Sequence, residues 1–475
     1  MISTELGDVG RLYYPRVTIE MLPDDVLLEI FEFYLGKDDP GKIVDNHNYD
    51  GWQLLVHVCC RWRIIVFASP CRLNLKLYCT RRRLVNSKTL DIWPTLPIVV
   101  FSRDLQSNED VTNVIAALRH HNRVCKIYHE EFQDSLLEIF TAIDEPFSEL
   151  TSLDLTSFAP NVPVLPDSFL GGSAPQLRSL NLFGIPYPSI GTLLSSTTNL
   201  VSLSLWRIPR SGYIAPEAIV PCLSMLPKLE FLEFGFKHPR SEAHRARRHP
   251  PPLTRVEFPN LTSLRFRGDI EYLEGILSQI ETPMLDYSRF HFFNQLVFDT
   301  TLLRHFIRRT ETFMTISGAC VQFWGGSFTL VGQEYTRRTV LYLEISCKAL
   351  DWQLSAVAQV SNLFLSSLPT LETLEIVLPH EDYQSEIEVI QWREFLDPFA
   401  YVKTMTLRSE DPVRLIAPAL QDFARERSTS VLPTLQTLFL RVYPSRPLPS
   451  GSPVETIEQF IATRQSYGKP ITVHY

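Results

Sequence analysis

The sequence predicts an α/β protein, a small helical module followed by a curved solenoid, and two observations support this. A unit with apolar residues at its first, fourth and sixth positions recurs from about residue 112 to the end of the chain. Stretches with helical spacing, such as 190–198 and 271–280, lie between copies of this unit. Stacked units of this kind form a solenoid, with parallel strands on the concave face and helices outside.

The repeated unit has the form L-x-x-L-x-L, and its last part predicts a short strand. In one copy, Leu203 and Leu205 should face the core while Ser204 and Trp206 face outward. Copies begin at Leu150, Leu177, Leu200, Leu229, Leu261, Val340, Leu371, Val402 and Leu435, with a weaker one at Val124. Their spacing matches or modestly exceeds the ~20–29 residues of leucine-rich repeats. The sites where those repeats place Asn or Cys hold Phe158, Ile185 and Ile208, so we expect an irregular variant.

The head of the chain predicts two short helices with apolar faces. The first follows Pro23, with Asp24 and Asp25 in its first turn and the stripe Val26, Leu27, Ile30, Phe31 and Tyr34. The second runs through 53–70 and ends at Ser69-Pro70, with one face made of Leu54, Leu55, Val58, Cys59, Trp62, Ile65 and Val66. Two such helices cannot bury their apolar faces against each other alone, so they must join a larger core or bind a partner.

This head resembles an F-box. The resemblance rests on Leu22-Pro23, the Val-Leu-Leu-x-Ile-Phe run at 26–31, the segment 58–63 and Ser69-Pro70. It departs from the family in the long polar segment 36–51 between the helices. With its repeats, the chain resembles the F-box/leucine-rich-repeat proteins of mushroom-type fungi, as in the phrases LDIWPTLPIVV and LPDSFLGGSAPQLRSLNL.

The resemblance implies a non-catalytic substrate receptor of an SCF-type ubiquitin ligase. Its head would be held by the Skp adaptor and cullin, and its solenoid would present a protein substrate. The motif positions imply an adaptor interface made of Leu22, Pro23, Val26, Leu27, Ile30, Phe31, Val58, Cys59 and Trp62. Phe31 and Trp62 would be its hot spots if they are exposed.

Outward positions of the strands are the candidates for substrate binding. One expected row contains Asp154, Asn181, Ser204, Glu233, Arg265, Glu344, Glu375, Thr406 and Phe439. A neighbouring row contains Phe183, Trp206, Arg267, Arg408 and Arg441. Exposed aromatic residues beside charges would suit a protein or peptide ligand, although loops could equally cover them.

The expected organisation has four parts. They are an N-terminal tail (1–16), the F-box-like module (17–72), a strand-and-loop connector (73–111) and the solenoid with its C-terminal cap (112–475). Within the solenoid, Leu285 is a candidate start of one unit, 316–335 resembles inserted strands, and 453–475 resembles a final helix and strand. The basic segment 237–255 is expected to be a solvated loop or, alternatively, a contact for an acidic or phosphorylated partner through Arg240, Arg245, Arg247 and Arg248.

Composition and motif searches narrow the function. The net charge of −8 gives no reason to expect nucleic-acid binding, and no apolar run reaches the length of a membrane span. The eight scattered cysteines and the lack of a secretory signal favour reduced thiols in the cytoplasm or nucleus. Phosphate-binding, dinucleotide-binding, zinc and nucleophile motifs are absent, so we expect no cofactor, no metal and no catalysis. The alternative is a repeat scaffold unconnected to ubiquitin, in which the head only caps the array.

Overall fold

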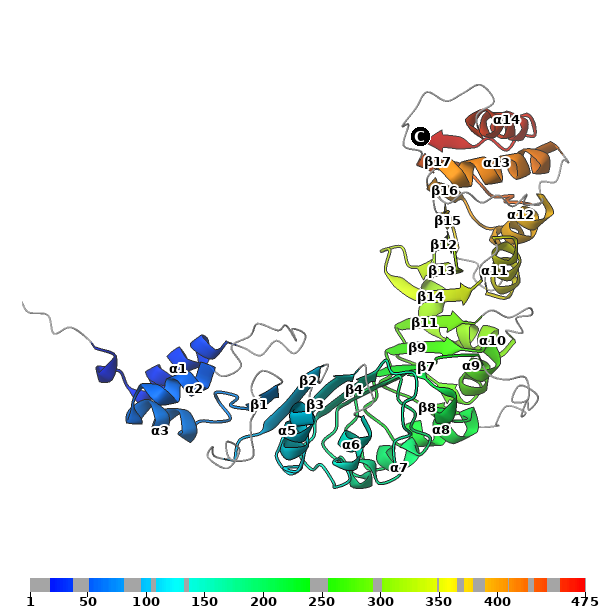
Figure 1. Cartoon of the computed structure of the whole chain (residues 1–475). Helices are drawn as coiled ribbons and strands as arrows, with labels where there is room; N and C mark the ends of the chain where they lie inside the picture. Colours follow the sequence, from blue (N-terminus) through cyan, green and yellow to red (C-terminus); the bar gives the residue numbers. More distant parts are fainter. Residues whose placement is uncertain are drawn as a thin grey trace, which may run out of the picture.

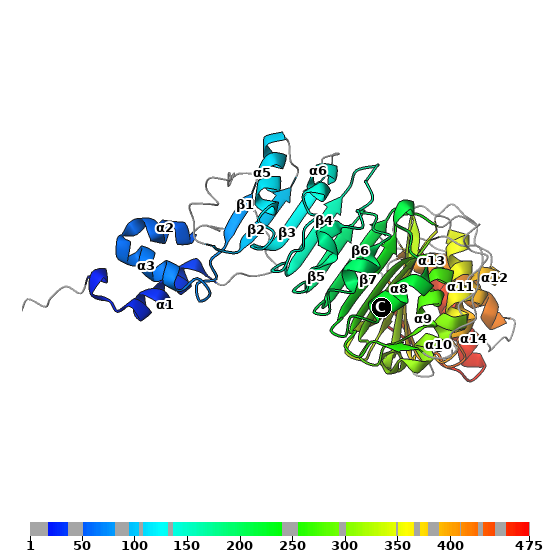
Figure 2. The same ribbon diagram turned by 90° about the horizontal axis from the view of Figure 1, so that it is seen from below.

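The computed structural model contains one long sheet that curves along its whole length. The structure describes residues 18–36, 51–80, 95–103, 108–131, 136–239, 255–293, 301–347, 350–364, 371–378, 389–408, 410–425, 431–441 and 453–474. Its main sheet has 16 strands, in the order β1-β2-β3-β4-β5-β6-β7-β9-β11-β14-β13-β12-β15-β16-β17-β18. Helices α5 to α14 cover the outer side of the curve, and the sheet forms its inner side (Figures 1 and 2). The predicted fold class is therefore confirmed.

The strands of the main sheet are short and mostly parallel. In the first half they are β1 Leu77–Thr80, β2 Ile98–Arg103, β3 Val124–Glu131, β4 Ser152–Ser157, β5 Ser179–Phe183, β6 Ser202–Ile208, β7 Phe231–Phe236, β9 Ser263–Gly268 and β11 Tyr287–Phe292. In the second half they are β12 Gly318–Trp324, β13 Ser327–Gln333, β14 Thr339–Ser346, β15 Thr373–Val377, β16 Thr404–Arg408, β17 Thr437–Arg441 and β18 Thr472–His474. The strands β8 Val256–Glu257 and β10 Ile280–Glu281 form a separate pair.

Helices connect the strands and contribute the other half of the core. Those of the solenoid are α5 Asn108–Leu118, α6 Leu136–Thr141, α7 Ile190–Leu194, α8 Pro216–Leu223, α9 Ile270–Leu277, α10 Thr301–Arg309, α11 Leu350–Phe364, α12 Val389–Leu396, α13 Glu410–Arg425 and α14 Pro453–Ser466. The helices α11 and α13 were missed by the sequence interpretation. In α13 the reason is visible, because Pro418 lies inside the helix and masks its helical pattern.

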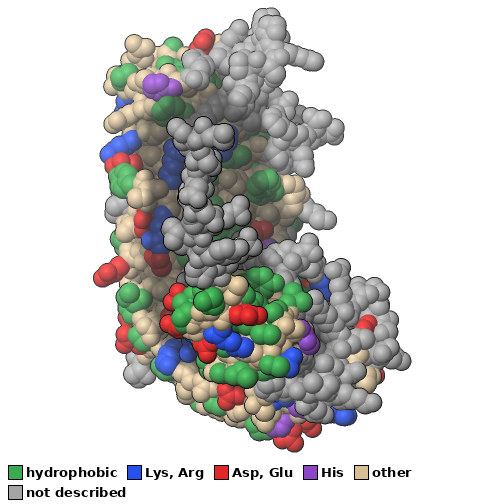
Figure 3. All heavy atoms as spheres, turned by 90° about the vertical axis from the view of Figure 1, so that its left-hand side faces the viewer, with side chains coloured by type: hydrophobic (Ala, Val, Ile, Leu, Met, Phe, Trp, Pro, Cys, Tyr) green, Lys and Arg blue, Asp and Glu red, His purple; other side chains and the backbone are tan. Residues whose placement is uncertain are grey.

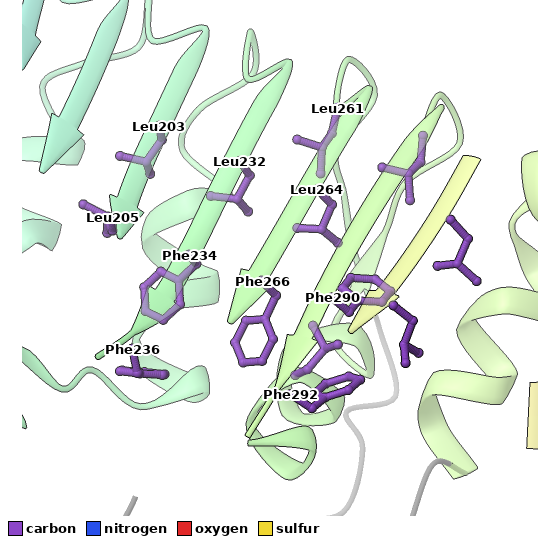
Figure 4. Packing of buried hydrophobic residues seen from close by; sticks show 14 of the residues in the cluster. Leu203, Leu205, Leu232, Phe234, Phe236, Leu261, Leu264, Phe266, Phe290 and Phe292 are labelled. Atoms are coloured by element: carbon purple, nitrogen blue, oxygen red, sulfur yellow. The ribbon is translucent and has the colours of Figure 1, made fainter. Parts of the chain in front are cut away.

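In-register pairing places the repeated leucines side by side. Leu180 pairs with Leu153 and Leu203, and Leu203 pairs with Leu232 on the next strand. These leucines are buried, and the residues after Leu153, Leu180 and Leu232 in the chain are half-buried; Ser204, expected to face outward, is in the same row but is itself buried. Figure 4 shows the resulting rows of leucine and phenylalanine side chains across neighbouring strands. The alternation predicted from L-x-x-L-x-L is confirmed.

The middle of the solenoid replaces leucine with stacked aromatic rings. Tyr272 of α9 is fully buried, and its ring stacks on Phe234 and on Phe266, with centroids 5.6 Å and 5.8 Å away. Its hydroxyl donates a hydrogen bond to the carbonyl oxygen of Ile214 at 2.6 Å. The larger rings fill the space between sheet and helix, while the one polar atom has a partner.

Two predicted irregularities of the solenoid are confirmed, whereas its predicted start at residue 112 is wrong. The segment 316–335 forms β12 and β13, an antiparallel hairpin inserted into the sheet between β14 and β15. Leu285 leads directly into β11. The segment 73–111, expected as a connector, instead contributes β1, β2 and the start of α5, so the solenoid begins at Leu77 rather than at residue 112. Its strand Ile98–Arg103 was missed because it lacks the repeat pattern and buries Ile98, Val99 and Val100 in succession.

The far end of the sheet has the predicted final helix and strand. Helix α14 packs against α13, and β18 pairs with β17 as the last strand of the sheet. In the described part of the chain, no helix is long and apolar enough to cross a membrane. All eight cysteines lie in that part, and each is a free thiol.

The aromatic core gives a test of the packing. We expect Phe266→Ala to lower the free energy of unfolding by about 3–5 kcal/mol, because it opens a cavity beside Tyr272. Urea unfolding of the purified chain would measure this loss. Tyr401→Ala, at an exposed position of the same solenoid, should change it by less than about 0.5 kcal/mol. Equal effects of the two substitutions would contradict the packing described.

Candidate protein-binding surfaces

The head consists of three helices rather than the two expected. They are α1 Asp24–Leu35, α2 Gly51–Val58 and α3 Cys60–Ala68, after a 3₁₀ turn at Ile19–Met21. The second expected helix breaks at Cys59, whose backbone is extended and whose Sγ accepts a hydrogen bond from the backbone N–H of Trp62 at 3.4 Å. Cys59 therefore acts as the N-cap of α3, which is why one apolar face does not continue through 53–70.

A small core holds the three helices together. Its buried members include Leu27, Phe31, Trp52, Leu55, Val56, Ile65 and Val66. Trp62 packs on Phe31 with ring centroids 4.7 Å apart. The indole N–H of Trp52 donates to the carbonyl oxygen of Lys76 at 3.0 Å, which ties α2 to the chain just before β1. The head lies beyond β1, at the N-terminal end of the sheet (Figure 1).

Arg61 fastens α3 to the start of α1. Its guanidinium donates to the carboxylate of Asp24 at 3.0 Å through Nε. It also donates to the carbonyl oxygens of Glu20 and Leu22, at 2.7 Å and 2.6 Å. Because a guanidinium carries five N–H groups in a rigid plane, one side chain can satisfy all three acceptors.

Each head helix also carries apolar side chains that remain exposed. We call the set the head stripe: Val26, Ile30, Phe33 and Tyr34 of α1, Leu54 and Val58 of α2, and Ile64 of α3. Phe33 is 90% exposed, Ile30 41% and Val58 60%. On α1 the exposed positions follow helical spacing beside the buried pair Leu27 and Phe31, so the helix has one apolar face for the core and another for solvent. In Figure 3 the head lies in front, and hydrophobic side chains are prominent on its visible surface.

The residues expected at an adaptor interface divide between surface and core. Pro23, Val26, Ile30, Val58 and Cys59 are exposed, and Leu22 and Trp62 are half-buried. Leu27 and Phe31 are buried in the head core, so their expected role as contacts, with Phe31 as a hot spot, is corrected. Helical spacing alone could not separate Ile30 from Phe31, because the covered side depends on where α2 and α3 pack. The exposed Phe33, Leu54 and Ile64 were missed.

The candidate substrate residues all lie on the open face of the sheet. Half-buried or exposed side chains are found at Asp154, Asn181, Phe183, Trp206, Glu233, Arg265, Arg267, Glu344, Glu375 and Arg408. Residues Asp154, Asn181, Ser204, Glu233 and Arg265 do share one row across the strands. That row continues through Arg289 of β11 and Tyr342 of β14. The side chain of Arg441 lies outside the described residues, as do Arg240, Arg245, Arg247 and Arg248.

Glu344 belongs to the neighbouring row, which corrects its expected position. It pairs with His291, and His291 pairs with Arg267. The error arose because the unit expected to start at Val340 lies two residues out of register. Ser288 and Phe290 of β11 pair with Leu341 and Leu343, so Tyr342 rather than Glu344 falls in the row. Leu285, Ser288 and Phe290 have the spacing of the repeated unit, and that was the available signal for β11.

Neighbouring strands pair opposite charges on this face. Glu233 accepts a hydrogen bond from Ser204 at 2.6 Å and lies 3.9 Å from Arg265. Glu344 lies 3.5 Å from both Arg289 and His291, and Glu375 lies 2.7 Å from Arg408. Figure 3 shows charged side chains of both signs next to one another along the sheet. A surface with this mixture suits a polar protein partner better than an apolar one.

Trp206 lies flat across the sheet because its neighbour is a glycine. The pairing of β6 with β7 shifts between Leu205 and Ile208, so Trp206 and the next residue, Arg207, are both half-buried. Arg207 has a φ of +54°, which is uncommon for a residue with a side chain. A Cβ added at Gly235 would lie 2.6 Å from the Trp206 ring and 3.0 Å from Arg267, so the ring occupies the space above Gly235.

Comparisons with family models and with curated proteins find no match for this chain. Among solved structures, the leucine-rich repeat-containing protein LegL7 from Legionella pneumophila is similar over 75% of this chain and 96% of that chain. The two are 13% identical and the TM-score is 0.29. This likeness is too weak to bear on function. Within the described residues, no three His, Cys, Asp or Glu side chains are grouped so as to hold a metal ion.

The Arg61 contacts predict a local stability effect. Arg61→Met should lower the stability of the head by about 1–2 kcal/mol, because it removes charge-assisted hydrogen bonds to the partly exposed start of α1. Faster hydrogen exchange of the α1 amides would report this loss. Arg72→Met removes only one exposed contact of 3.4 Å, to Glu32, and should leave those rates nearly unchanged. Unchanged exchange in Arg61→Met would contradict the role of Arg61.

His291 predicts a dependence of stability on pH. The pKa of His291 is lowered from 6.5 to about 4: burial is the largest cause, Glu344 opposes it, and Arg267 and Arg289 add to it. As the pH falls from 6.5 towards 4, His291 is therefore protonated in the unfolded chain but stays neutral in the folded chain. The contribution of neutral His291 to the free energy of unfolding is fully present above pH 6.5. We expect the free energy of unfolding to fall by on the order of 2 kcal/mol by about pH 4.5 through this group.

Substitution separates this effect from general acid unfolding. His291→Gln should lose less stability between pH 7 and pH 4.5 than the parent chain, measured by urea unfolding at both values. The exposed His305→Gln serves as the control and should lose as much as the parent. The assignment fails if His291→Gln and the parent chain lose the same amount.

Proposed function

We propose that this chain is a non-catalytic receptor that joins a protein substrate to an SCF-type ubiquitin ligase. The head would bind the Skp adaptor, and through it the cullin, while the open face of the sheet binds the substrate. The observation that carries the proposal is the head stripe, since the head buries Leu27, Phe31 and Leu55 and still leaves apolar residues of all three helices in solvent. Exposed apolar surface of this kind is typical of a site for another protein.

The sequence motif gains a physical basis from the head geometry. Of the segment Val-Cys-Cys-Arg-Trp-Arg, Cys59 caps α3, Arg61 fastens α1, and Trp62 packs on Phe31. Arg63 donates to the carbonyl oxygen of Val56 near the end of α2, at 3.0 Å. These residues hold the three helices in one arrangement, which supports a resemblance in fold to the F-box.

The second candidate is a repeat scaffold whose head only caps the array. It is favoured by the hydrogen bond from Trp52 to Lys76 and by the continuity of the head core with Leu73, Leu75 and Leu77. A cap needs a polar outer surface, however, because nothing is stacked on it. The exposed Phe33, Leu54 and Ile64 therefore favour the adaptor-binding head. Eight free thiols suit a reducing compartment, and we place the protein in the cytoplasm or nucleus.

Co-purification of the full chain with a Skp-type adaptor tests the proposal. Ile30→Glu and Val58→Glu put a charge into the head stripe at exposed positions, so folding should be retained. We expect each to weaken adaptor binding by at least about tenfold, because a charge would be buried against apolar surface.

Ile390→Glu is the matched control. Ile390 is 49% exposed, lies on α12 of the solenoid and should leave adaptor binding unchanged. If the parent chain does not bind the adaptor, or if all three variants bind equally well, the ligase assignment is abandoned for the scaffold.

A further inference from the structure

Four basic residues gather where β6, β7 and β9 end, and we call them the basic rim: Arg207, Arg210, Lys237 and Arg267. Arg207 lies at the irregular end of β6, and Arg210 begins the 3₁₀ turn that follows. Lys237 comes directly after β7, and its backbone N–H donates to the carbonyl oxygen of Ile208 at 2.9 Å. Arg267 is on β9, where it pairs with Gly235 of β7.

The basic rim differs from the other cations of the sheet face in having no acidic partner. In the described part of the chain, no carboxylate forms an ion pair with any of its four members, whereas Arg265, Arg289 and Arg408 each lie beside a glutamate. The Nε of Arg267 is buried and makes no hydrogen bond. Burial and then the charge of Arg207 lower the pKa of Arg267, against the opposing effect of Glu344. Within the described residues, these cations therefore have no direct ion pair, in a chain whose net charge is −8.

All four cations of the basic rim affect the pKa of one neighbouring residue, His238. The pKa of the exposed His238 is lowered by burial and then by Lys237, Arg210, Arg207 and Arg267. The strand pairing agrees with this, because Lys237 is hydrogen-bonded to Ile208 of β6 and Arg267 pairs with Gly235 of β7, so the four cations lie at the adjoining ends of three neighbouring strands. Without a bound anion, it is electrostatically unfavourable to hold these like charges close together, because each repels its neighbours.

Aromatic rings, rather than carboxylates, hold the two half-buried arginines. The Arg207 guanidinium lies 5.4 Å from the centroid of Phe183, and that of Arg267 lies 5.6 Å from the centroid of Phe293. Phe183 is in turn 5.2 Å from Phe158, and Trp206 covers Gly235 beside Arg267. A guanidinium packed on a ring keeps the N–H groups in its plane free to bind an anion.

We propose that the basic rim binds a peptide segment with closely spaced negative charges, with Phe158, Phe183 and Trp206 packing against its backbone and side chains. The charges would be Asp and Glu carboxylates or phosphates on serine or threonine, because guanidinium groups bind both in the same forked geometry. This inference rests on the proposed function, since the segment would belong to the substrate presented by the sheet face.

Fluorescence anisotropy of labelled peptides with the full chain tests the site. The probes are a peptide of alternating glutamate and serine, the same peptide with glutamine for glutamate and phosphoserine for serine, and a neutral peptide of glutamine and serine. We expect one of the two acidic peptides to bind and the neutral one to bind at least about tenfold more weakly. Which acidic peptide binds more tightly identifies the source of the charge.

Variants connect binding to the basic rim. Arg210→Gln, at an exposed position, and Arg267→Gln should each weaken binding of the acidic peptide by about tenfold. Arg408→Gln removes a cation from the same face that is already paired with Glu375, and should change binding by less than about twofold. Arg210→Gln keeps the test decisive even if Arg267→Gln folds poorly.

Three results would overturn the proposal. They are equal binding of the neutral peptide, an equal loss in Arg408→Gln and Arg210→Gln, and tighter binding of a single-stranded RNA than of either acidic peptide. Adaptor binding is measured in parallel on the same variants. If the parent chain binds the adaptor but neither acidic peptide, only the basic-rim proposal is rejected. If it binds an acidic peptide but not the adaptor, only the ligase assignment is rejected.

Discussion

In-register pairing of parallel strands is the constraint on which the rest of the structure depends. Each strand contributes the same positions to the core, so Leu153, Leu180 and Leu203 stack while the intervening side chains point outward. Because adjacent strands are only about 4.8 Å apart, every outward side chain has neighbours within reach on both sides. The rows of charges on the open face follow directly from this spacing, and so does the need to pair each charge with its neighbour.

The departure from regular pairing between β6 and β7 lies at the basic rim. At β6 the shifted register brings Trp206 and Arg207 to the surface in succession, and Gly235 leaves room for the indole on the next strand. A regular strand would have turned one of the two side chains into the core. The glycine on β7 and the positive φ of Arg207 are therefore two parts of one local arrangement, and the basic rim depends on both.

The head obeys a different rule, because its helices are too short to be stable alone and must share a core. Leu27 and Phe31 supply one side of that core, and Arg61 secures the helix start that carries them. Only one side of α1 is buried in this core. The side that includes Ile30 and Phe33 is exposed, on a head that lies at the N-terminal end of the sheet (Figure 1).

Local patterns in the sequence were sufficient for the solenoid and for the existence of an apolar head, but not for features that depend on distant segments. The L-x-x-L-x-L unit predicts which side chains face outward, since alternation is a property of a single strand. It does not predict that Glu344 neighbours His291, because this requires knowing that the β12–β13 hairpin leaves β14 beside β11. The basic rim was missed for the same reason. Arg207 and Arg267 are far apart in the chain, and only the shared ends of β6, β7 and β9 bring their charges together, so a site built across repeats has no signature within any one of them.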